Sequence, residues 1–192
     1  MHNAMPVPVP VMAADSDPPT ARTPDYAAAA ASEQSTYRRL LDMFDDQDVP
    51  YRLMVHEPEG QTHRASELRG HALSAAAKCM VVALSAGKAQ PAQRYVLAVV
   101  PGDRRVDFKQ IARACGVRKA RLAEQVAAED LGRTVSGTIT PFAFHPALEL
   151  LADPALFDVP ELYFNAARLD RSVAIRTEDY RRLARPRVAS IT

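Results

Sequence analysis

Lys78 is the residue whose setting most suggests chemistry. Small residues lead up to it, and the apolar run that follows, with Val81 and Val82 at its centre, is typical of a strand buried on both faces. A lysine is seldom buried unless its ammonium is paired or used. Two interpretations stay open: the side chain reaches the surface from the end of a strand, or it stands at the floor of a pocket and meets an anionic or carbonyl-bearing ligand.

A second candidate is the G-x-x-x-P loop at residues 137–141, which runs into Phe142. Glycine lets the backbone come close to a ligand, and proline stiffens the exit from the loop. Successive free main-chain N–H groups in such a loop can hold an anion or a developing oxyanion. The alternative is an ordinary turn before a strand.

Basic residues are concentrated between residues 104 and 121, where seven of them stand against one acid, Asp107. On the expected helix, Lys109 and Arg113 are four residues apart and share a face. In a chain of formal net charge +1, this concentration is the pattern expected of a contact with a phosphate backbone. The alternative is a solvated helix face. The seven residues are Arg104, Arg105, Lys109, Arg113, Arg118, Lys119 and Arg121.

The remaining reactive side chains form no recognisable centre. No His pair has zincin spacing, no His/Cys cluster suggests zinc, and neither a G-x-S-x-G elbow nor a P-loop is present. Cys79 adjoins Lys78 and is a candidate nucleophile, but alternation along a strand turns it away from Lys78, so we expect a small core residue. Asp153 and Asn165 each follow an expected strand, where a polar residue either caps a turn or lines a site.

Length and composition limit the class of protein. With 192 residues, 47% of them hydrophobic, the chain can form one domain with a sizeable core plus a tail. The small net charge excludes a strongly basic protein, so any nucleic-acid contact depends on a local patch, and we expect no DNA partner. No apolar stretch reaches transmembrane length, nothing resembles a secretory signal, and the two cysteines lack metal spacing. We expect a cytoplasmic protein without a membrane contact, while its oligomeric state stays open.

Residues 1–32 differ from the rest of the chain, because they hold six of the fifteen prolines and an alanine run. Such a composition cannot bury enough apolar area to offset the entropy cost of ordering. We therefore predict a disordered leader over residues 1–32 and a folded domain over residues 33–187.

Hydrophobic periodicity predicts helices and strands in the folded domain. In the first helix, Tyr37, Leu40, Leu41 and Phe44 form one apolar stripe, with Ser32 as a cap. The predicted helices cover residues 33–47, a short segment ending at Gly70, and residues 107–115, 124–131 and 178–183. The predicted strands cover residues 51–56, 78–84, 95–100, 119–123, 148–152, 162–164 and 172–176. This order predicts a mixed α/β (α+β) single domain with one mixed central β-sheet flanked by helices.

Four segments together resemble one family, the free-standing bacterial aminoacyl-tRNA deacylases related to the editing insertion domain of prolyl-tRNA synthetase, often called YbaK-type. Two are Ala-Ala-Lys-Cys-Met-Val-Val at 76–82 and Leu-Ala-Val-Val-Pro-Gly-Asp-Arg-Arg-Val-Asp at 97–107. The others are the G-x-x-x-P-F loop at 137–142 and Phe-Asn-Ala-Ala at 164–167, which resembles an F-N-A-G segment. The chain departs from the family pattern at two positions. One is Ala167, the last residue of the 164–167 segment, where glycine is usual, and the other is Ala143.

The resemblance implies hydrolysis of the ester between a mischarged amino acid and the 3′ adenosine of a tRNA, without a metal or another cofactor. Lys78 would orient the terminal adenosine or the substrate. The loop that begins at Gly137 would cradle the aminoacyl carbonyl and the α-amino group through its main chain. A water molecule, helped by the free ribose 2′-hydroxyl, would attack the carbonyl. Because an aminoacyl ester is already activated, positioning and oxyanion stabilisation can supply most of the rate.

The resemblance also implies site residues and partners. Stretches 56–62 and 66–70 look closest to a subgroup acting on Ser- and Thr-charged tRNA. The implied partner is the 3′ acceptor end of an aminoacyl-tRNA, with an aminoacyl-tRNA synthetase as a further candidate. The implied catalytic residues are Lys78 and Gly137, and the implied substrate-binding residues are Thr138, Ile139, Thr140, Pro141, Phe142, Asn165, His56 and Thr62.

Two other functions stay open at this point. One is a tRNA- or small-ligand-binding module that kept the fold and lost turnover, and the other is a hydrolase that uses Cys79 as its nucleophile. The editing hypothesis requires the Lys78 amine and the 137–141 turn to converge on one pocket.

Overall fold

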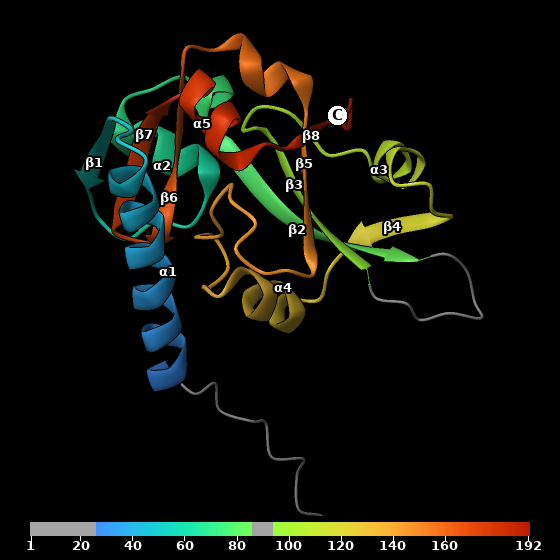
Figure 1. Cartoon of the computed structure of the whole chain (residues 1–192), viewed down its shortest axis with the longest axis horizontal. Helices are drawn as coiled ribbons and strands as arrows, with labels where there is room; N and C mark the ends of the chain where they lie inside the picture. The colour runs from blue at the N-terminus through green and yellow to red at the C-terminus, as the bar shows by residue number, and fades with distance from the viewer. Residues whose placement is uncertain (1–25, 86–93) are drawn as a thin grey trace, which may run out of the picture.

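The computed structural model describes residues 26–85 and 94–192 (Figure 1). Residues 1–25, which make up most of the expected leader, and residues 86–93, which follow the expected strand 78–84, lie outside the described residues. The helices are α1 (Tyr26–Asp46), α2 (Thr62–Arg69), α3 (Phe108–Ala114), α4 (Gln125–Gly132) and α5 (Thr177–Ala184), with 3₁₀ turns η1 (Leu73–Ala75) and η2 (Pro154–Asp158). The strands are β1 (Tyr51–Val55), β2 (Ala77–Ser85), β3 (Arg94–Pro101), β4 (Lys119–Leu122), β5 (Leu148–Ala152), β6 (Glu161–Arg168), β7 (Arg171–Arg176) and β8 (Arg187–Val188).

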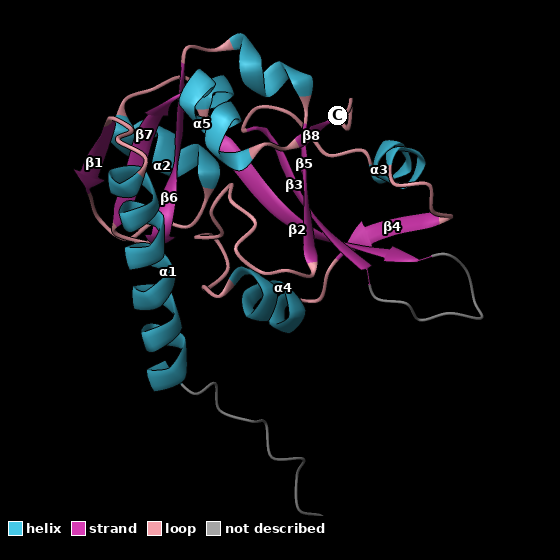
Figure 2. Ribbon diagram, in the orientation of Figure 1, coloured by secondary structure: helices cyan, strands magenta, loops and turns pink. Residues whose placement is uncertain are grey.

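The strands form two sheets, not the one central sheet that we expected (Figure 2). The smaller sheet has the order β1-β7-β6 and is antiparallel. The larger sheet has the order β4-β2-β3-β5-β8 and is mixed, because β3 pairs antiparallel with β2 and parallel with β5. A single parallel bridge between Ala76 and Tyr163 links the two sheets. The predicted fold class, a mixed α/β single domain, is confirmed, and the division into two sheets is the correction.

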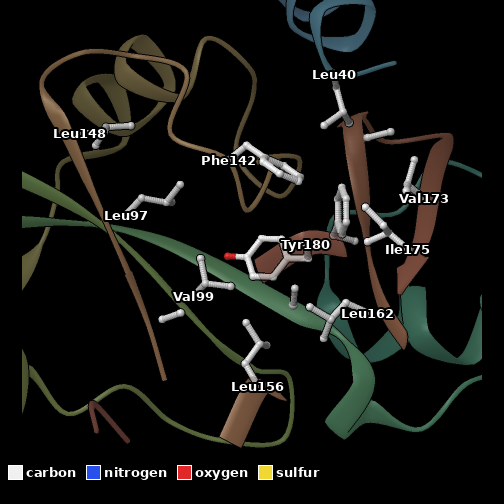
Figure 3. Packing of buried hydrophobic residues seen from close by; sticks show 14 of the residues in the cluster. Leu40, Leu97, Val99, Phe142, Leu148, Leu156, Leu162, Val173, Ile175 and Tyr180 are labelled. Atoms are coloured by element: carbon white, nitrogen blue, oxygen red, sulfur yellow. The ribbon is translucent and has the colours of Figure 1, made fainter. Parts of the chain in front are cut away.

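The main core lies between the two sheets and under α1 and α5 (Figure 3). Leu97 of β3 and Leu162 of β6 meet there, and both are fully buried. Phe142 stands at the centre, with its ring centroid 5.7 Å from that of Phe44 and 5.4 Å from that of Tyr180. The aromatic loop residue therefore ties α1 and α5 to the space between the sheets.

A second core covers the opposite face of the larger sheet. Val82 and Val100 pack there against Ile111 and Cys115 at α3. Both Val82 and its neighbour Val81 are at most 1% exposed, although they point to opposite faces. The prediction of a strand buried on both faces after Lys78 is therefore confirmed.

The first helix begins earlier than predicted. It starts at Tyr26 and not at Glu33, so Ser32 lies inside the helix and does not cap it. Alanine has the highest intrinsic helix propensity, and the alanine run that we assigned to the leader extends the helix. Leu40 and Phe44 of the predicted apolar stripe are fully buried. No helix in the described residues is long and apolar enough to cross a membrane.

Two aspartates fix the ends of local elements. Asp107 caps α3 as predicted, since its Oδ1 accepts the N–H groups of Lys109 at 2.7 Å and Gln110 at 3.2 Å. Asp153, for which a turn cap and a site were both open, caps η2 by accepting the N–H of Ala155. Its other oxygen, Oδ2, accepts the N–H of Ile191 at 2.9 Å, which holds the C-terminal segment beside the larger sheet.

Tyr180 offers a test of the core. Its side chain is fully buried, and its hydroxyl has no hydrogen-bond partner among the described residues. Leaving a buried hydroxyl unpaired costs roughly 1–3 kcal/mol. We expect Tyr180→Phe to raise the free energy of unfolding by about 1 kcal/mol in urea titrations, because that cost disappears. The cavity left by Tyr180→Ala should lower the same quantity by about 3–5 kcal/mol. A Tyr180→Phe variant less stable than the wild type would contradict the absence of a partner.

Candidate active site

One cavity of about 240 Å³ brings together residues that are far apart in the sequence. It lies between β2 and β6, and the start of α2 and the 137–141 loop complete its wall. Five of the predicted site residues line it, namely Thr62, Lys78, Gly137, Ile139 and Asn165. A larger hollow elsewhere is an open groove along the outer side chains of α1 and contains none of the predicted residues.

The cavity occupies a free edge of β2. The neighbouring strand β4 pairs with β2 only from Val82 to Ser85, so residues 77–80 have no strand partner on that edge within the described part of the chain. Because the cavity lies along an edge, both Lys78 and Cys79 line it, although their side chains leave opposite faces of the strand. Cys79 therefore turns away from Lys78, as alternation along the strand predicted, although both residues line the cavity.

The Lys78 side chain is half-buried, and main-chain oxygens hold its ammonium. The ammonium donates to the carbonyl oxygen of Gly102 at 3.1 Å and to that of Arg104. Burial lowers the pKa of Lys78 below its ordinary value, an effect that Asp103 opposes and Arg105 reinforces. The geometry favours a lysine at a pocket over one that extends into solvent. The ammonium is nevertheless anchored to the turn after β3 and does not contact the 137–141 loop.

Cys79 lacks the properties of a nucleophile. Burial raises the pKa of its thiol well above the ordinary value, so the reactive thiolate is scarce near neutral pH. Its Sγ lies 3.6 Å from the carbonyl oxygen of Ala77. Cys79 packs against the main core, as expected of a small core residue.

Gly137 lies where only a glycine fits. Its φ of +90° belongs to the region that L side chains rarely adopt. A Cβ at this position would stand 2.7 Å from Cα and 2.9 Å from the carbonyl oxygen of Gly60. Two main-chain segments, one before α2 and one after α4, therefore meet at the cavity without intervening side chains.

Asn165 fastens these two segments together. Its Nδ2 donates to the carbonyl oxygen of Glu59 at 2.8 Å and to that of Gly137 at 3.0 Å. Its Oδ1 accepts the hydroxyl of Ser172 at 3.1 Å, and that hydroxyl lies 2.7 Å from Nε2 of His56. His56 and Asn165 thus belong to one hydrogen-bonded chain. We predicted both as substrate-binding residues, but their side chains hold protein groups.

Two residues at this site were not predicted from the sequence, Ser172 and Arg69. Ser172 is fully buried and lies directly opposite Asn165 in the β6–β7 pair. A lone hydroxyl on the buried face of an apolar strand was the available signal. Arg69 lines the cavity from the end of α2. No pattern in the sequence separates Arg69 from the other exposed or half-exposed arginines.

Four of the predicted loop residues point into the protein. Thr138 is fully buried, and its hydroxyl contacts that of Thr134 and donates to the carbonyl oxygen of Val135 at 2.8 Å. Thr140, Pro141 and Phe142 are buried as well and do not line the cavity. The prediction that these side chains bind substrate lacks support, because they anchor the loop and leave its main chain at the cavity.

The chain departs from the usual family glycine at Ala167, and the backbone there is left-handed, with a φ of 57°. An alanine tolerates this conformation at a cost of roughly 1–2 kcal/mol, which explains why glycine is favoured. The carbonyl oxygen of Ala167 accepts the hydroxyl of Thr134 at 3.1 Å. The departure therefore keeps the backbone shape that a glycine permits.

All seven basic residues of the predicted tRNA-binding segment are exposed. Arg104 and Arg105 lie in the turn that holds the Lys78 ammonium, beside the cavity. Lys119 on β4 pairs with Ser85 at the other end of β2, seven residues away, which corresponds to about 23 Å along the strand. The basic segment therefore extends from the cavity across α3 to the far end of the larger sheet.

Comparisons with known proteins agree with this geometry. Residues 56–183 match the family model of the aminoacyl-tRNA editing domain. The chain is 37% identical over 156 residues to the multifunctional Ser/Thr-tRNA deacylase ProXp-y of Escherichia coli strain K12, which covers 81% of this chain and 92% of that protein. The same protein of Escherichia coli O157:H7 matches equally well.

Solved structures share the fold. The hypothetical protein APE2540 superposes with a TM-score of 0.71 at 20% identity, covering 80% of this chain and 98% of that one. A candidate trans-editing enzyme for prolyl-tRNA synthetase superposes with a TM-score of 0.67 at 17% identity, covering 82% and 96%. With the family model matching about two thirds of its length, this chain belongs to the aminoacyl-tRNA editing domain family.

Proposed function

We propose that this protein is a trans-editing hydrolase that removes a wrongly attached amino acid, serine or threonine, from the 3′ end of a tRNA. The observation that carries this proposal is the cavity that both Lys78 and the Gly137 loop line. The choice of serine and threonine rests on the relative that is named a Ser/Thr-tRNA deacylase and matches over 92% of its length.

The loop main chain offers donors for a developing oxyanion. Among the described residues, the N–H groups of Gly137 and Ile139 have no acceptor, whereas the N–H of Thr138 donates to the carbonyl oxygen of Val135 at 3.1 Å. The Asn165 side chain donates a hydrogen bond to the carbonyl oxygen of Gly137, which fixes the orientation of the peptide group between Gly137 and Thr138. Two free N–H groups at a cavity wall match the requirement for stabilising a tetrahedral intermediate.

The reaction then needs little from side chains. A water molecule adds to the ester carbonyl, the bond to the ribose 3′ oxygen breaks, and that oxygen takes up the proton that the water loses. The neighbouring ribose 2′-hydroxyl can relay this proton, since no carboxylate from the described residues lines the cavity. Lys78, held by two carbonyl oxygens, supplies a fixed positive charge beside the bound nucleotide. Positioning and electrostatic stabilisation supply the rate.

The proposal includes partners and a location. The tRNA acceptor end enters the cavity, and the basic segment from Arg104 to Arg121 contacts its phosphates. The chemistry of the substrate also suggests an aminoacyl-tRNA synthetase as a further partner. It suggests the cytoplasm as the site of action. A panel of tRNAs charged with serine, threonine, alanine and cysteine tests the proposal. Release of none of these amino acids would favour a binding module without turnover.

Lys78 is the first residue to test. We expect Lys78→Ala to reduce the rate of deacylation at least 100-fold and to leave the far-ultraviolet circular dichroism spectrum unchanged, because the ammonium contacts only two main-chain oxygens. Alkylation of the thiols should have little effect on the rate, because the Cys79 thiol takes no part. Strong inactivation by alkylation, combined with full activity of Lys78→Ala, would instead support a cysteine hydrolase.

Gly137→Ala tests the close approach of the two main chains. The new methyl group would overlap Gly60, so the loop must move. We expect a loss of activity of at least 100-fold. Gly116→Ala is the matched control, since Gly116 also has a positive φ, of 64°, but a Cβ added there would meet no atom within 4 Å. Gly116→Ala should lose about 1 kcal/mol of stability through backbone strain. Gly137→Ala should lose more than that because of the overlap with Gly60, and only Gly137→Ala should lose activity. Equal activities would contradict the assigned role of the loop.

The basic segment is tested by neutralising Arg113 and Arg118 together. Each lost phosphate contact should lower the slope of log affinity against log salt by about one, so we expect weaker tRNA binding with a shallower salt dependence. Arg38→Gln with Arg185→Gln changes the net charge equally at positions elsewhere on the surface and serves as the control. Identical affinities for the two double variants in low and moderate salt would remove the segment from the binding surface.

A further inference from the structure

Arg69 lies in the wall of the cavity and forms no ion pair with an acid in residues 26–85 and 94–192. Its Nε donates to the carbonyl oxygen of Ala65 at 2.7 Å. Its Nη1 is buried and has no hydrogen-bond partner among the described residues. Burial alone lowers the pKa of Arg69 to about 10, and no acid offsets that effect. Buried charges in proteins are normally paired, so an unpaired guanidinium in a cavity calls for a ligand that supplies the missing acceptor.

The surroundings of Arg69 leave it available to an anion. Among the residues that the structure describes, Arg69 and Lys78 are the charged ones that line the cavity, and no acid lines it. The Lys78 ammonium is already bound to two carbonyl oxygens. Glu161 is an acid near this region, because burial lowers the pKa of His71 and the charge of Glu161 opposes that effect. Its carboxylate accepts hydrogen bonds from Arg52 at 2.6 Å and from the Tyr163 hydroxyl at 2.5 Å. Within the described residues, Arg69 is therefore the lining cation with a buried N–H group that lacks a partner, whereas the Lys78 ammonium is held by two carbonyl oxygens.

The position of Arg69 separates it from the reacting end of the cavity. Helix α2 begins at Thr62, beside the point where Gly60 meets Gly137. The Arg69 side chain folds back along α2, and its Nε donates to the carbonyl oxygen of Ala65, four residues earlier in the helix. Arg69 and Gly137 line the same cavity, so an ester carbonyl held at the N–H groups of the Gly137 loop would have Arg69 further along the same cavity wall.

The substrate offers one anion at that place. The carboxyl group of the amino acid is esterified, its α-amino group is a cation or neutral, and a serine or threonine hydroxyl carries no charge. The phosphodiester on the 5′ side of the terminal adenosine is negative and lies one ribose from the ester. Guanidinium groups pair with phosphate oxygens through short, charge-assisted hydrogen bonds.

We propose that Arg69 binds the phosphodiester that joins the terminal adenosine of the tRNA to the preceding nucleotide. This contact rests on the proposed function and makes Arg69 a positioning residue: it places the terminal ribose so that the ester carbonyl reaches the Gly137 loop. The enzyme would then recognise a charged nucleotide end as well as the amino acid, and free amino-acid esters would be poor substrates.

Neutralising the phosphate itself gives the sharpest test. The substrates are the mischarged tRNA that the wild-type protein hydrolyses best, with either its natural last phosphodiester or an uncharged methylphosphonate at that linkage. We expect the methylphosphonate to lower kcat/KM of the wild type about 10- to 100-fold, as for the loss of a hydrogen bond to a charged group. Arg69→Gln should lose as much on the natural tRNA, yet differ less than about threefold between the two substrates.

Two variants of α2 serve as controls. Arg64→Gln removes an exposed arginine from the same helix and should discriminate between the substrates as the wild type does. Arg69→Lys keeps the charge without the planar guanidinium and should restore part of the discrimination. Wild-type protein that hydrolyses both substrates equally, or Arg69→Gln protein that still discriminates fully, would overturn the proposal. A wild type inactive on every natural tRNA would instead refute the proposed function.

Stability distinguishes this role from a structural one. A buried cation without a partner destabilises the free protein, so Arg69→Gln should leave the melting temperature unchanged or raise it. Addition of a tRNA that ends in a natural phosphodiester should raise the melting temperature of the wild type more than that of Arg69→Gln. A melting temperature several degrees lower in free Arg69→Gln would show that the guanidinium stabilises the fold, and would count against a ligand-binding role.

Discussion

The contact between the main chains of Gly60 and Gly137 is the constraint on which the site depends. It brings the segment before α2 against the loop after α4, with Asn165 of β6 donating to a carbonyl oxygen of each. Ser172 in turn fixes Asn165, and His56 fixes Ser172. Because these groups are largely buried, removing any one of them would leave a neighbour unsatisfied, at a cost of roughly 1–3 kcal/mol. The loop therefore has its shape before any substrate arrives.

This prepared shape explains how a site with few reactive side chains can act on an ester. We propose that the N–H groups of Gly137 and Ile139 are the donors at its wall; because the fold fixes this loop, no reorganisation would accompany the reaction. The buried side chains of Thr138 and Phe142 hold the loop from the core. In the part of the chain that the structure describes, two cations and no acid line the cavity, which suits a nucleotide whose phosphate is negative. Selectivity and rate would then both come from placing the substrate.

Local patterns in the sequence were sufficient for much of the fold and for part of the site. The apolar run after Lys78, the Asp107 cap and the glycine of the 137–141 loop each depend on a few neighbouring residues, and the structure has them as predicted. The two sheets depend on which strands pair, and pairing is decided by packing between distant segments. The direction of each loop side chain also depends on the core around it. For this reason Thr138, Thr140, Pro141 and Phe142 were predicted at the substrate but lie beneath the loop.

The roles of Arg69 and Ser172 at the site could not be predicted from the sequence alone. One arginine among many becomes distinctive only when its partners can be counted, and one serine only when its cross-strand neighbour is known. The backbone at Ala167 makes the same point, since its left-handed φ explains a departure from the family pattern that the sequence could only register. In each case the prediction needed the positions of residues in space, whereas the residue types were already known from the sequence.

A structure with a non-hydrolysable substrate analogue would test the central claim most directly. In such an analogue, an amide replaces the ester between serine and the 3′ position of a short oligonucleotide that ends in adenosine. The account predicts the analogue's carbonyl oxygen within hydrogen-bond distance of the Gly137 and Ile139 N–H groups, inside the cavity that Lys78 lines. An analogue bound elsewhere, or bound there with its carbonyl turned away from the loop, would contradict it.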